Sequence, residues 1–156
     1  GTSPEQGSFA LTVFFSIGIF MTYIGGLLGD KYGPIKIIRL SLLIWLPSMF
    51  LLTQVPEFSV TIMMPLAYLI LLMIGAAKAI SYSPVIVLGQ TYLAKSIGFA
   101  SGITLGVSQT IGGIIAPVVG NLADTYSLPA AMMTLVPFLI VGLVASLLLK
   151  DPKKLQ

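Results

Sequence analysis

The chain has 156 residues, of which 56% are hydrophobic and only 8% are charged, and its net charge is +3. A soluble domain carries roughly 25% charged residues, and a disordered chain combines low hydrophobicity with high charge, so both classes are excluded. The sequence has no cysteine and no histidine, which excludes disulfides, thiol nucleophiles, imidazole bases and zinc or iron–sulfur sites. We therefore expect an all-α, polytopic membrane protein with no metal and no cofactor.

Five segments in chain order are apolar enough to cross a bilayer, which requires about 20 residues per helix. They are residues 8–29, 37–54, 60–92, 96–123 and 128–149. The second span is interrupted only by Arg39 near its start, and the third only by Lys78. Pro129 suits the first turn of the fifth helix. The connectors are too short to hold a folded domain, so we expect the function to lie among the helices.

The basic residues are distributed unevenly between the two ends of these spans. One end receives Lys31, Lys36, Arg39, Lys95, Lys150, Lys153 and Lys154. The other end receives no lysine or arginine and holds Glu5, Glu57 and Asp124. Because lysine and arginine concentrate on the cytoplasmic side of membrane proteins, we expect the N-terminus outside and the C-terminus in the cytoplasm.

The end of the first span is repeated near the end of the fourth. Residues 26–32 (GLLGDKY) and 120–126 (GNLADTY) both follow the pattern G-x-L-small-D-x-Y, 94 positions apart. Such an ending also arises by chance, but here the two copies leave the membrane on opposite sides, as in the inverted repeats of transporters. The repeat makes spans one and four second members of two helix triplets. One further helix then precedes the first span within a six-helix half.

The third span contains the one charged residue that is far from both membrane surfaces. Lys78 lies 12 residues before Gln90, about 18 Å along a helix, and a charge at this depth costs about 3 kcal/mol or more. Ser81 and Tyr82 follow at helical spacing and share its face. We interpret these residues as lining a substrate cavity; the alternative is a structural ion pair with a carboxylate elsewhere in the protein. Pro84 removes a helix hydrogen bond and is a candidate hinge.

Small residues of the fourth span fall within one narrow stripe when placed at 100° per residue. The stripe contains Gly98, Gly102, Gly106, Gly113 and Gly120. We call it the glycine seam and expect it to pack closely against a neighbouring helix. Gln109 lies within the seam and is a further candidate for the substrate cavity. Ser101, Thr104 and Ser108 form a second stripe that either lines a cavity or bonds to the carbonyls of its own helix.

Residues 26–36 resemble the loop motif of the major facilitator superfamily, which runs roughly G-x-L-[GA]-D-[RK]-x-G-[RK]-[RK]. The chain matches it at Gly26, Leu28, Gly29, Asp30, Lys31 and Gly33 and departs from it at positions 34 and 35. The resemblance implies a gating loop formed by Gly26, Asp30, Lys31, Gly33 and Arg39. Independently of the family, the glycines at 25, 26 and 29 allow a neighbouring backbone to approach closely.

Residues 81–90, 98–102, 112–113 and 120–124 are similar to the C-terminal half of fosmidomycin-resistance-type efflux proteins. Pro117, after Ala116 and before Gly120, is similar to the kink motif of antiporters and is a second candidate hinge. The resemblance implies that residues 1–156 are helices 8 to 12 of a twelve-helix drug-resistance antiporter in the bacterial inner membrane. Its partners are then the N-terminal half, one further helix, the lipid bilayer and a small-molecule substrate, with no nucleic acid.

The function that this resemblance implies is proton-driven efflux of a small polar or anionic compound by alternating access. An importer of organic or phosphorylated anions in the same superfamily is the first alternative. A membrane scaffold subunit without transport is the second, although it needs neither Lys78 nor an inverted repeat. We do not expect an enzyme, because the spans contain no paired carboxylates, histidine or cysteine.

Overall fold

The computed structural model describes residues 4–54 and 60–150, and within these ranges it is almost entirely helical and has no strand. Its elements are α1 (Pro4–Tyr32), α2 (Pro34–Gln54), α3 (Val60–Tyr92), η2 (Ala94–Ser96), α4 (Ile97–Gly102), η3 (Ile103–Val107), α5 (Ser108–Thr125), α6 (Leu128–Met133) and α7 (Val136–Leu148). Five helical segments are long and apolar enough to cross a membrane, which confirms the predicted fold class. The predicted connector at 55–59, with Glu57, and the basic residues Lys153 and Lys154 lie outside the described residues.

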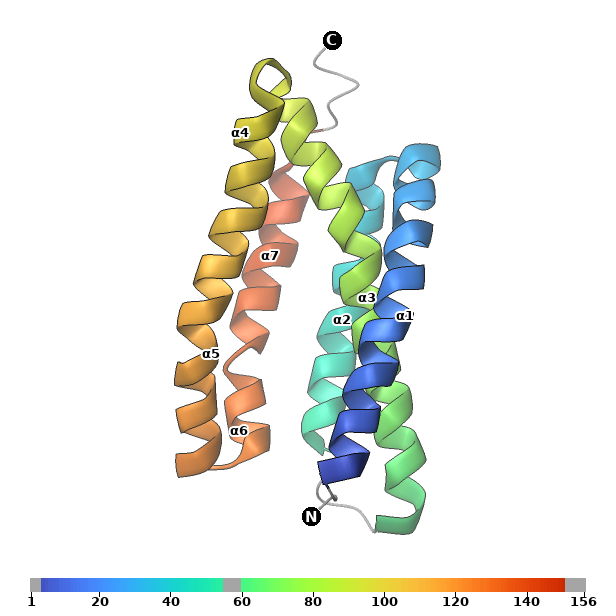
Figure 1. The fold of residues 1–156 in the computed structure, drawn as a ribbon, viewed down its shortest axis with the longest axis vertical. Helices are drawn as coiled ribbons and strands as arrows, with labels where there is room; N and C mark the ends of the chain where they lie inside the picture. The colour runs from blue at the N-terminus through green and yellow to red at the C-terminus, as the bar shows by residue number, and fades with distance from the viewer. Residues whose placement is uncertain (1–3, 55–59, 151–156) are drawn as a thin grey trace.

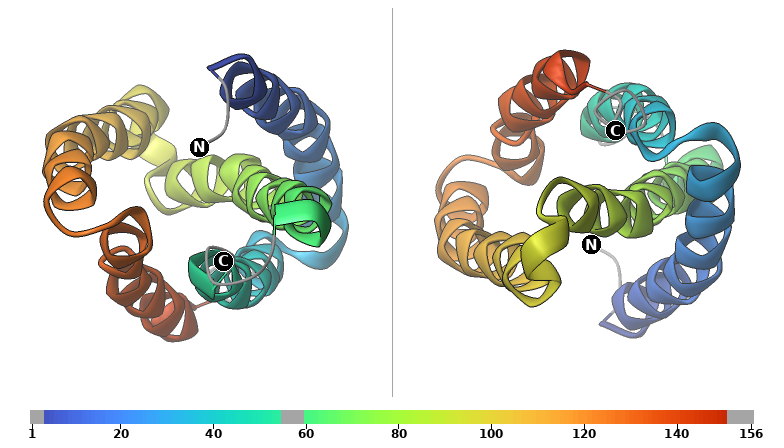
Figure 2. Two further views of the ribbon diagram at one scale, coloured as in Figure 1. Left: turned by 90° about the horizontal axis from the view of Figure 1, so that it is seen from below. Right: turned by 90° about the horizontal axis from the view of Figure 1, so that it is seen from above.

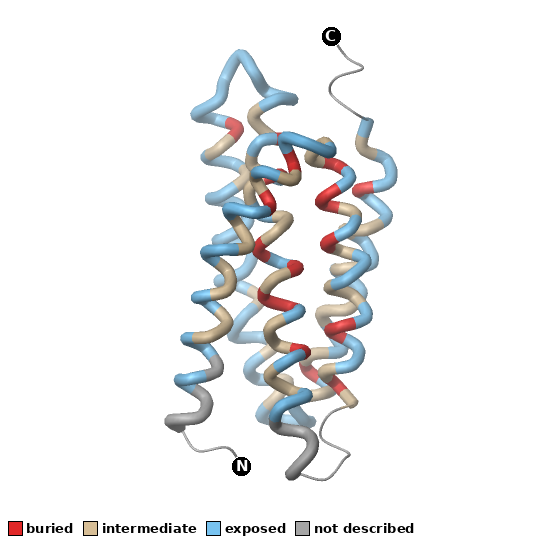
Figure 3. The backbone as a smooth tube through the Cα atoms, turned by 90° about the vertical axis from the view of Figure 1, so that its right-hand side faces the viewer, coloured by how far each residue is buried: buried red, intermediate tan, exposed pale blue. Residues whose placement is uncertain are grey.

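Helix α3 runs through the middle of the bundle, and the other helices surround it (Figures 1 and 2). It packs along α1 and α2, and tilts so that its end meets α4, while α2 also contacts α6 and α7. One apolar cluster joins Met49 of α2 to Ile70 and Ile74 of α3, and a smaller one joins Ile35, Ile38 and Leu88. Buried residues are few and scattered along the described helices, and α5 has none (Figure 3). Much of the apolar surface is therefore available to lipid or to other helices.

Glycines of α1 bring this helix into close contact with α3. A Cβ atom on Gly25 would lie 2.8 Å from the carbonyl carbon of Ile80, and one on Gly29 would lie 3.1 Å from the ring of Pro84. A Cβ atom on Gly26 would lie 3.2 Å from the hydroxyl oxygen of Ser83, which precedes Pro84 in α3. The expectation that a neighbouring backbone approaches closely is therefore confirmed for Gly25, whereas Gly26 and Gly29 meet side chains of α3. Pro84 is one of the most deeply buried side chains.

The turn between α1 and α2 is a single residue. Gly33 has a φ of +95°, a left-handed conformation that costs a non-glycine residue roughly 1–2 kcal/mol. Its N–H donates to the carbonyl of Gly29 at 2.9 Å, and Pro34 begins α2 directly afterwards. Asp30 and Lys31 consequently belong to the last turn of α1 rather than to a longer loop, because the helix continues beyond the predicted end of the first span.

The fourth and fifth spans are interrupted where the sequence suggested continuous helices. In the fourth, η3 is a π-helical turn between α4 and α5, so the residues after it are rotated from the positions that 100° per residue gives. In the fifth, α6 ends at Met133 and α7 begins at Val136. Pro137 explains this break, because it has no N–H to donate and its ring clashes with the carbonyl four residues earlier. Ser127 caps α6 through the N–H of Ala130, with Pro129 in the first turn as predicted.

The two copies of the repeated motif lie at the C-terminal ends of antiparallel helices, α1 and α5, at opposite ends of the bundle (Figure 1). The described basic residues other than Lys78 all lie at the end where α1 finishes, and Asp124 lies at the other. The chain therefore folds with the charge asymmetry that the sequence predicted. Which end faces the cytoplasm stays a prediction.

Candidate functional site

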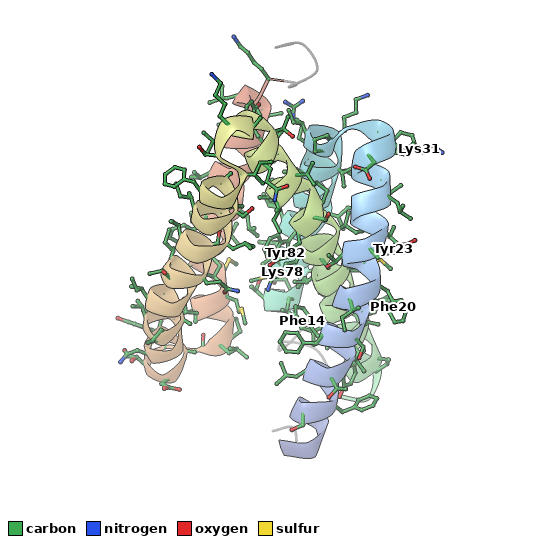
Figure 4. All side chains as sticks on the ribbon, turned by 45° about the horizontal axis from the view of Figure 1, so that its top comes forward. Phe14, Phe20, Tyr23, Lys31, Lys78 and Tyr82 are labelled. Carbon is green, nitrogen blue, oxygen red and sulfur yellow. The ribbon has the colours of Figure 1, made fainter. Side chains whose placement is uncertain are left out.

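A pocket of about 320 Å³ lies between α1 and α3 and contains Lys78. Helix α1 contributes Phe14, Phe15, Gly18, Ile19 and Thr22, and α3 contributes Gly75, Lys78, Ala79 and Tyr82. Phe14, Lys78 and Tyr82 point to the side of α1 and α3 that faces α4 and α5, whereas Phe20 and Tyr23 point away from it (Figure 4). The pocket thus opens on the side of α1 and α3 that faces α4 and α5, and several of its lining side chains, Lys78 and Tyr82 among them, are exposed there.

Lys78 lies at the middle of its membrane span. The span runs from Pro65 to Tyr92, so the residue is 13 positions from one end and 14 from the other, roughly 20 Å in each direction along a helix. A lysine side chain reaches an interface only from near a helix end. We therefore expect the ammonium to stay within the membrane interior, and this depth remains a prediction.

The contacts of Lys78 are aromatic. Its Nζ lies 6.0 Å from the centroid of the Phe14 ring, which is within the range of a cation–π interaction. Among the residues that the structure describes, no carboxylate forms an ion pair with it. A lysine in this setting is available to an anion that enters the pocket.

Of the four predicted cavity residues, the pocket brings together two. Tyr82 lines it with Lys78, and within the described part of the chain its hydroxyl has no hydrogen-bond partner. The Ser81 hydroxyl donates to the carbonyl of Lys78 at 2.9 Å and does not line the pocket. Gln109 lies on the exposed face of α5, outside this pocket.

The glycine seam has no neighbour within the described residues. A Cβ atom added to any of its five glycines would meet nothing within 4 Å. A shallow groove of about 470 Å³ passes over Gly102 and Gly106 instead. The close helix contact predicted for the seam is therefore absent from the described part of this chain. Within the described residues, glycines of α1 make a close helix contact instead.

Hydrogen bonds distinguish the two interpretations of the second polar stripe. The hydroxyl of Thr104 donates to the carbonyl of Ala100 at 2.8 Å, and that of Ser108 donates to the carbonyl of Thr104. The hydroxyl of Ser101 instead accepts a hydrogen bond from the side chain of Gln90 in α3, at 2.9 Å. The stripe bonds to its own helix and to α3, so it favours the structural alternative over a polar cavity wall.

The predicted gating residues separate into two groups. Asp30 is exposed at the end of α1, and Lys31 places its ammonium 5.1 Å from the centroid of the Tyr32 ring. Arg39 lies in α2, and its guanidinium donates to the carbonyl of Ser146 at 2.9 and 3.0 Å and to those of Leu147 and Leu149. These carbonyls end α7 and have no partner within their own helix, so Arg39 caps α7 and complements its dipole.

Because Arg39 caps α7 whereas Asp30 is exposed at the end of α1, substitutions of these two residues are expected to have different effects. Arg39→Gln removes charged hydrogen bonds and is expected to lower the stability of the full-length protein by about 1.5–3 kcal/mol. Asp30→Asn leaves the described contacts intact and is expected to reduce the transport rate more than substrate binding. Thermal unfolding in detergent and transport at matched expression measure both effects. Unchanged transport by Asp30→Asn would remove the gating role from this residue.

The candidate hinges lie within continuous helices. Pro84 is buried within α3, and α5 continues through Pro117 from Ser108 to Thr125. The structure therefore has its irregular points elsewhere, at η3 and at the break after Met133. A hinge at either proline remains a prediction.

Sequence reasoning missed the aromatic and glycine residues that shape the pocket. Gly75 precedes Lys78 by three residues and so shares its helix face, which is a signal that the sequence contains. Phe14 and Phe15 lie in an apolar helix where nothing local distinguishes a pocket residue from one that faces lipid. Their role follows only from the packing of α1 on α3.

A family model described as Major Facilitator Superfamily matches residues 1–156. The chain belongs to the major facilitator superfamily. One similar protein is described as the uncharacterized MFS-type transporter YfnC of Bacillus subtilis (strain 168), with 32% identity over 151 residues. The match covers 97% of this chain and 35% of YfnC, so the chain spans about a third of the length of that relative. No solved structure matches the chain.

Membership of the superfamily and five apolar helices of membrane length make this an integral membrane chain. The superfamily resemblance seen in residues 26–36 is thereby confirmed. This superfamily is one of transporters, which agrees with the interpretation of a non-enzymatic protein.

Proposed function

We propose that the chain is part of the C-terminal half of a twelve-helix secondary transporter that exports a small polar or anionic compound. The observation that carries the proposal is Lys78, which lies at mid-membrane in a pocket of about 320 Å³ between α1 and α3. An intramembrane charge is costly and normally faces a substrate path, water or a partner. The pocket is large enough for a small molecule, and its single cation favours an anion.

The mechanism that we propose is alternating access coupled to the proton gradient, with a fosmidomycin-type phosphonate as the model substrate. The likeness of residues 81–90 and 120–124 to fosmidomycin-resistance-type proteins supports this choice. The described spans contain no aspartate or glutamate near the pocket, so a proton carrier would lie in another part of the full-length protein. The remaining helices and the bilayer are then the partners of this chain.

The open face of α4 and α5 supports the proposal that further helices of the same protein complete the bundle. Gly98, Gly102 and Gly106 lie on this face with nothing within 4 Å, and α5 buries no residue. Glycines in membrane helices favour close packing against another helix. The contact of α1 with α3 shows how the same kind of surface is used elsewhere in the bundle.

Transport by the full-length protein in proteoliposomes tests the function. With the vesicle interior acidic, radiolabelled fosmidomycin is expected to accumulate in exchange for protons, and a protonophore is expected to abolish the accumulation. Accumulation that instead needs the opposite proton gradient would favour the importer. No movement of any small anion under either gradient would contradict the proposal and leave the scaffold alternative.

The proposed orientation can be tested by cysteine labelling, since the chain contains no native cysteine. A cysteine at Asp124 is expected to react with a membrane-impermeant maleimide in intact cells. A cysteine at Lys36, at the opposite end of the bundle, is expected to react only after permeabilisation. The reverse pattern would place the N-terminal end of α1 in the cytoplasm.

A further inference from the structure

The pocket around Lys78 combines a single cation with an otherwise apolar, aromatic wall. Among the described residues that line it, the other polar side chains are those of Thr22 and Tyr82, and the Thr22 hydroxyl already donates to the carbonyl of Gly18 at 2.8 Å. The ammonium of Lys78 and the hydroxyl of Tyr82 are therefore the side-chain groups that a ligand can reach. A strongly hydrated ion such as inorganic phosphate would lose its bound water against these apolar residues. One ammonium group would offset only part of that free-energy cost, so such an ion is expected to bind weakly here.

Phe14 is held beside this cation by the shape of α3. A Cβ atom on Gly75 would lie 2.9 Å from Cδ2 and 3.1 Å from Cε2 of the Phe14 ring, so the ring rests directly on the glycine. Lys78 follows Gly75 by three residues on the same helix face, and its Nζ lies 6.0 Å from the centroid of that ring. Phe15 meets Phe14 edge to face, with centroids 5.6 Å apart. The rings of Phe14 and Phe15 therefore form an aromatic surface directly beside the ammonium of Lys78.

We propose that the pocket selects small amphipathic monoanions, in which a flat apolar ring carries one negative group, and that Phe14 is the residue that determines this specificity. The anionic group pairs with Lys78 and accepts a hydrogen bond from Tyr82, while the ring packs against Phe14 and Phe15. Aromatic rings favour offset or edge-to-face packing, which an aliphatic body does not reproduce. This inference rests on the proposed function, which it narrows from small anions in general to ring-bearing monoanions. An aliphatic phosphonate such as fosmidomycin is then expected to bind less tightly than a ring-bearing anion.

Binding to the purified full-length protein, measured by calorimetry, tests the inference with a matched set of probes. The probes are 2-naphthoate, neutral 2-naphthamide, inorganic phosphate and decahydro-2-naphthoate, which has a saturated ring system and the same charge. We expect 2-naphthoate to bind most tightly, by about fivefold over the saturated acid, which is the scale of one aromatic pair. Equal binding of the amide, or tighter binding of phosphate, would overturn the inference.

Two variants locate the effect at Phe14. Phe14→Leu keeps an apolar side chain and is expected to remove the preference for 2-naphthoate over the saturated acid, while Lys78 still binds both. Gly75→Ala is expected to do the same by displacing the ring. The matched control is Phe20→Leu, because Phe20 lies on the same helix but is 70% exposed and points away from the pocket (Figure 4). An unchanged preference in Phe14→Leu, or an equal loss in Phe20→Leu, would contradict the role of Phe14.

The same probes distinguish this inference from the proposed function. If the full-length protein in proteoliposomes transports 2-naphthoate and the saturated acid at equal rates, selection by Phe14 is wrong and anion transport stands. If 2-naphthoate binds with the predicted preference but is not transported under either proton gradient, the specificity of the pocket stands and the transport proposal fails.

Discussion

Gly25→Ala is expected to destabilise the full-length protein by about 3 kcal/mol, the upper part of the range for inserting a methyl group into a packed interior. The new Cβ atom would lie 2.8 Å from the carbonyl carbon of Ile80, and backbone cannot move aside as a flexible side chain can. Helices α1 and α3 must separate to accept it. Thermal unfolding in detergent, followed by size-exclusion chromatography, measures the loss.

Gly18→Ala is the matched control on the same helix. A Cβ atom there would meet nothing within 4 Å, and alanine is a better helix former than glycine. We expect this variant to be as stable as the wild type or slightly more stable. If Gly25→Ala unfolds at the same temperature as Gly18→Ala, the close approach of α1 to α3 is not present in the protein.

The glycine seam of α4 and α5 gives the contrasting case. A Cβ atom added at Gly102 or Gly106 would meet no neighbour within 4 Å among the described residues. Intolerance of Gly102→Leu and Gly106→Leu in the full-length protein would therefore show that helices outside this chain pack on the seam. Wild-type stability and transport in both variants would mean that the seam faces lipid.

The positions of the five spans follow from the sequence because the bilayer imposes its thickness on every helix. The predicted limits differ from the observed spans by a few residues, and two departures from the predicted helices have local causes. Gly33 turns the chain within one residue, so α1 extends through Asp30 and Lys31. Pro137 ends α6, although the apolar run continues past it. Counting apolar residues predicts neither the one-residue turn at Gly33 nor the helix break before Pro137.

The contacts between helices follow from the sequence only in part. Gly25 and Gly29 in α1, and Gly102 and Gly106 in α4 and η3, have the same helical spacing and apolar surroundings, yet only the first pair meets another helix within the described chain. The spacing of small residues shows that a helix can pack closely, and the fold decides which face does so. For the same reason, Lys78 was identified from its depth alone, whereas Phe14 required the packed structure.

Lys78→Met is expected to weaken binding of anionic substrates by the full-length transporter by about 1–3 kcal/mol, or about five- to 150-fold in Kd. Methionine keeps the length and apolar character of the side chain and removes only the charge. Neutral compounds of the same shape should lose much less, because their contacts with the apolar wall remain. Binding of 2-naphthoate and of neutral 2-naphthamide measures the difference.

If the pocket is the substrate site, anion binding must depend both on the positive charge of Lys78 and on its position in the pocket. Lys36→Met, which removes an exposed charge at the end of the bundle, is the control and is expected to leave anion binding unchanged. Lys78→Arg keeps the charge but replaces a compact ammonium by a larger planar group beside Phe14, so we expect it to retain part of the binding. If Lys78→Met binds anions normally while its stability falls, Lys78 pairs with a carboxylate elsewhere in the protein, and the structural interpretation replaces the functional one.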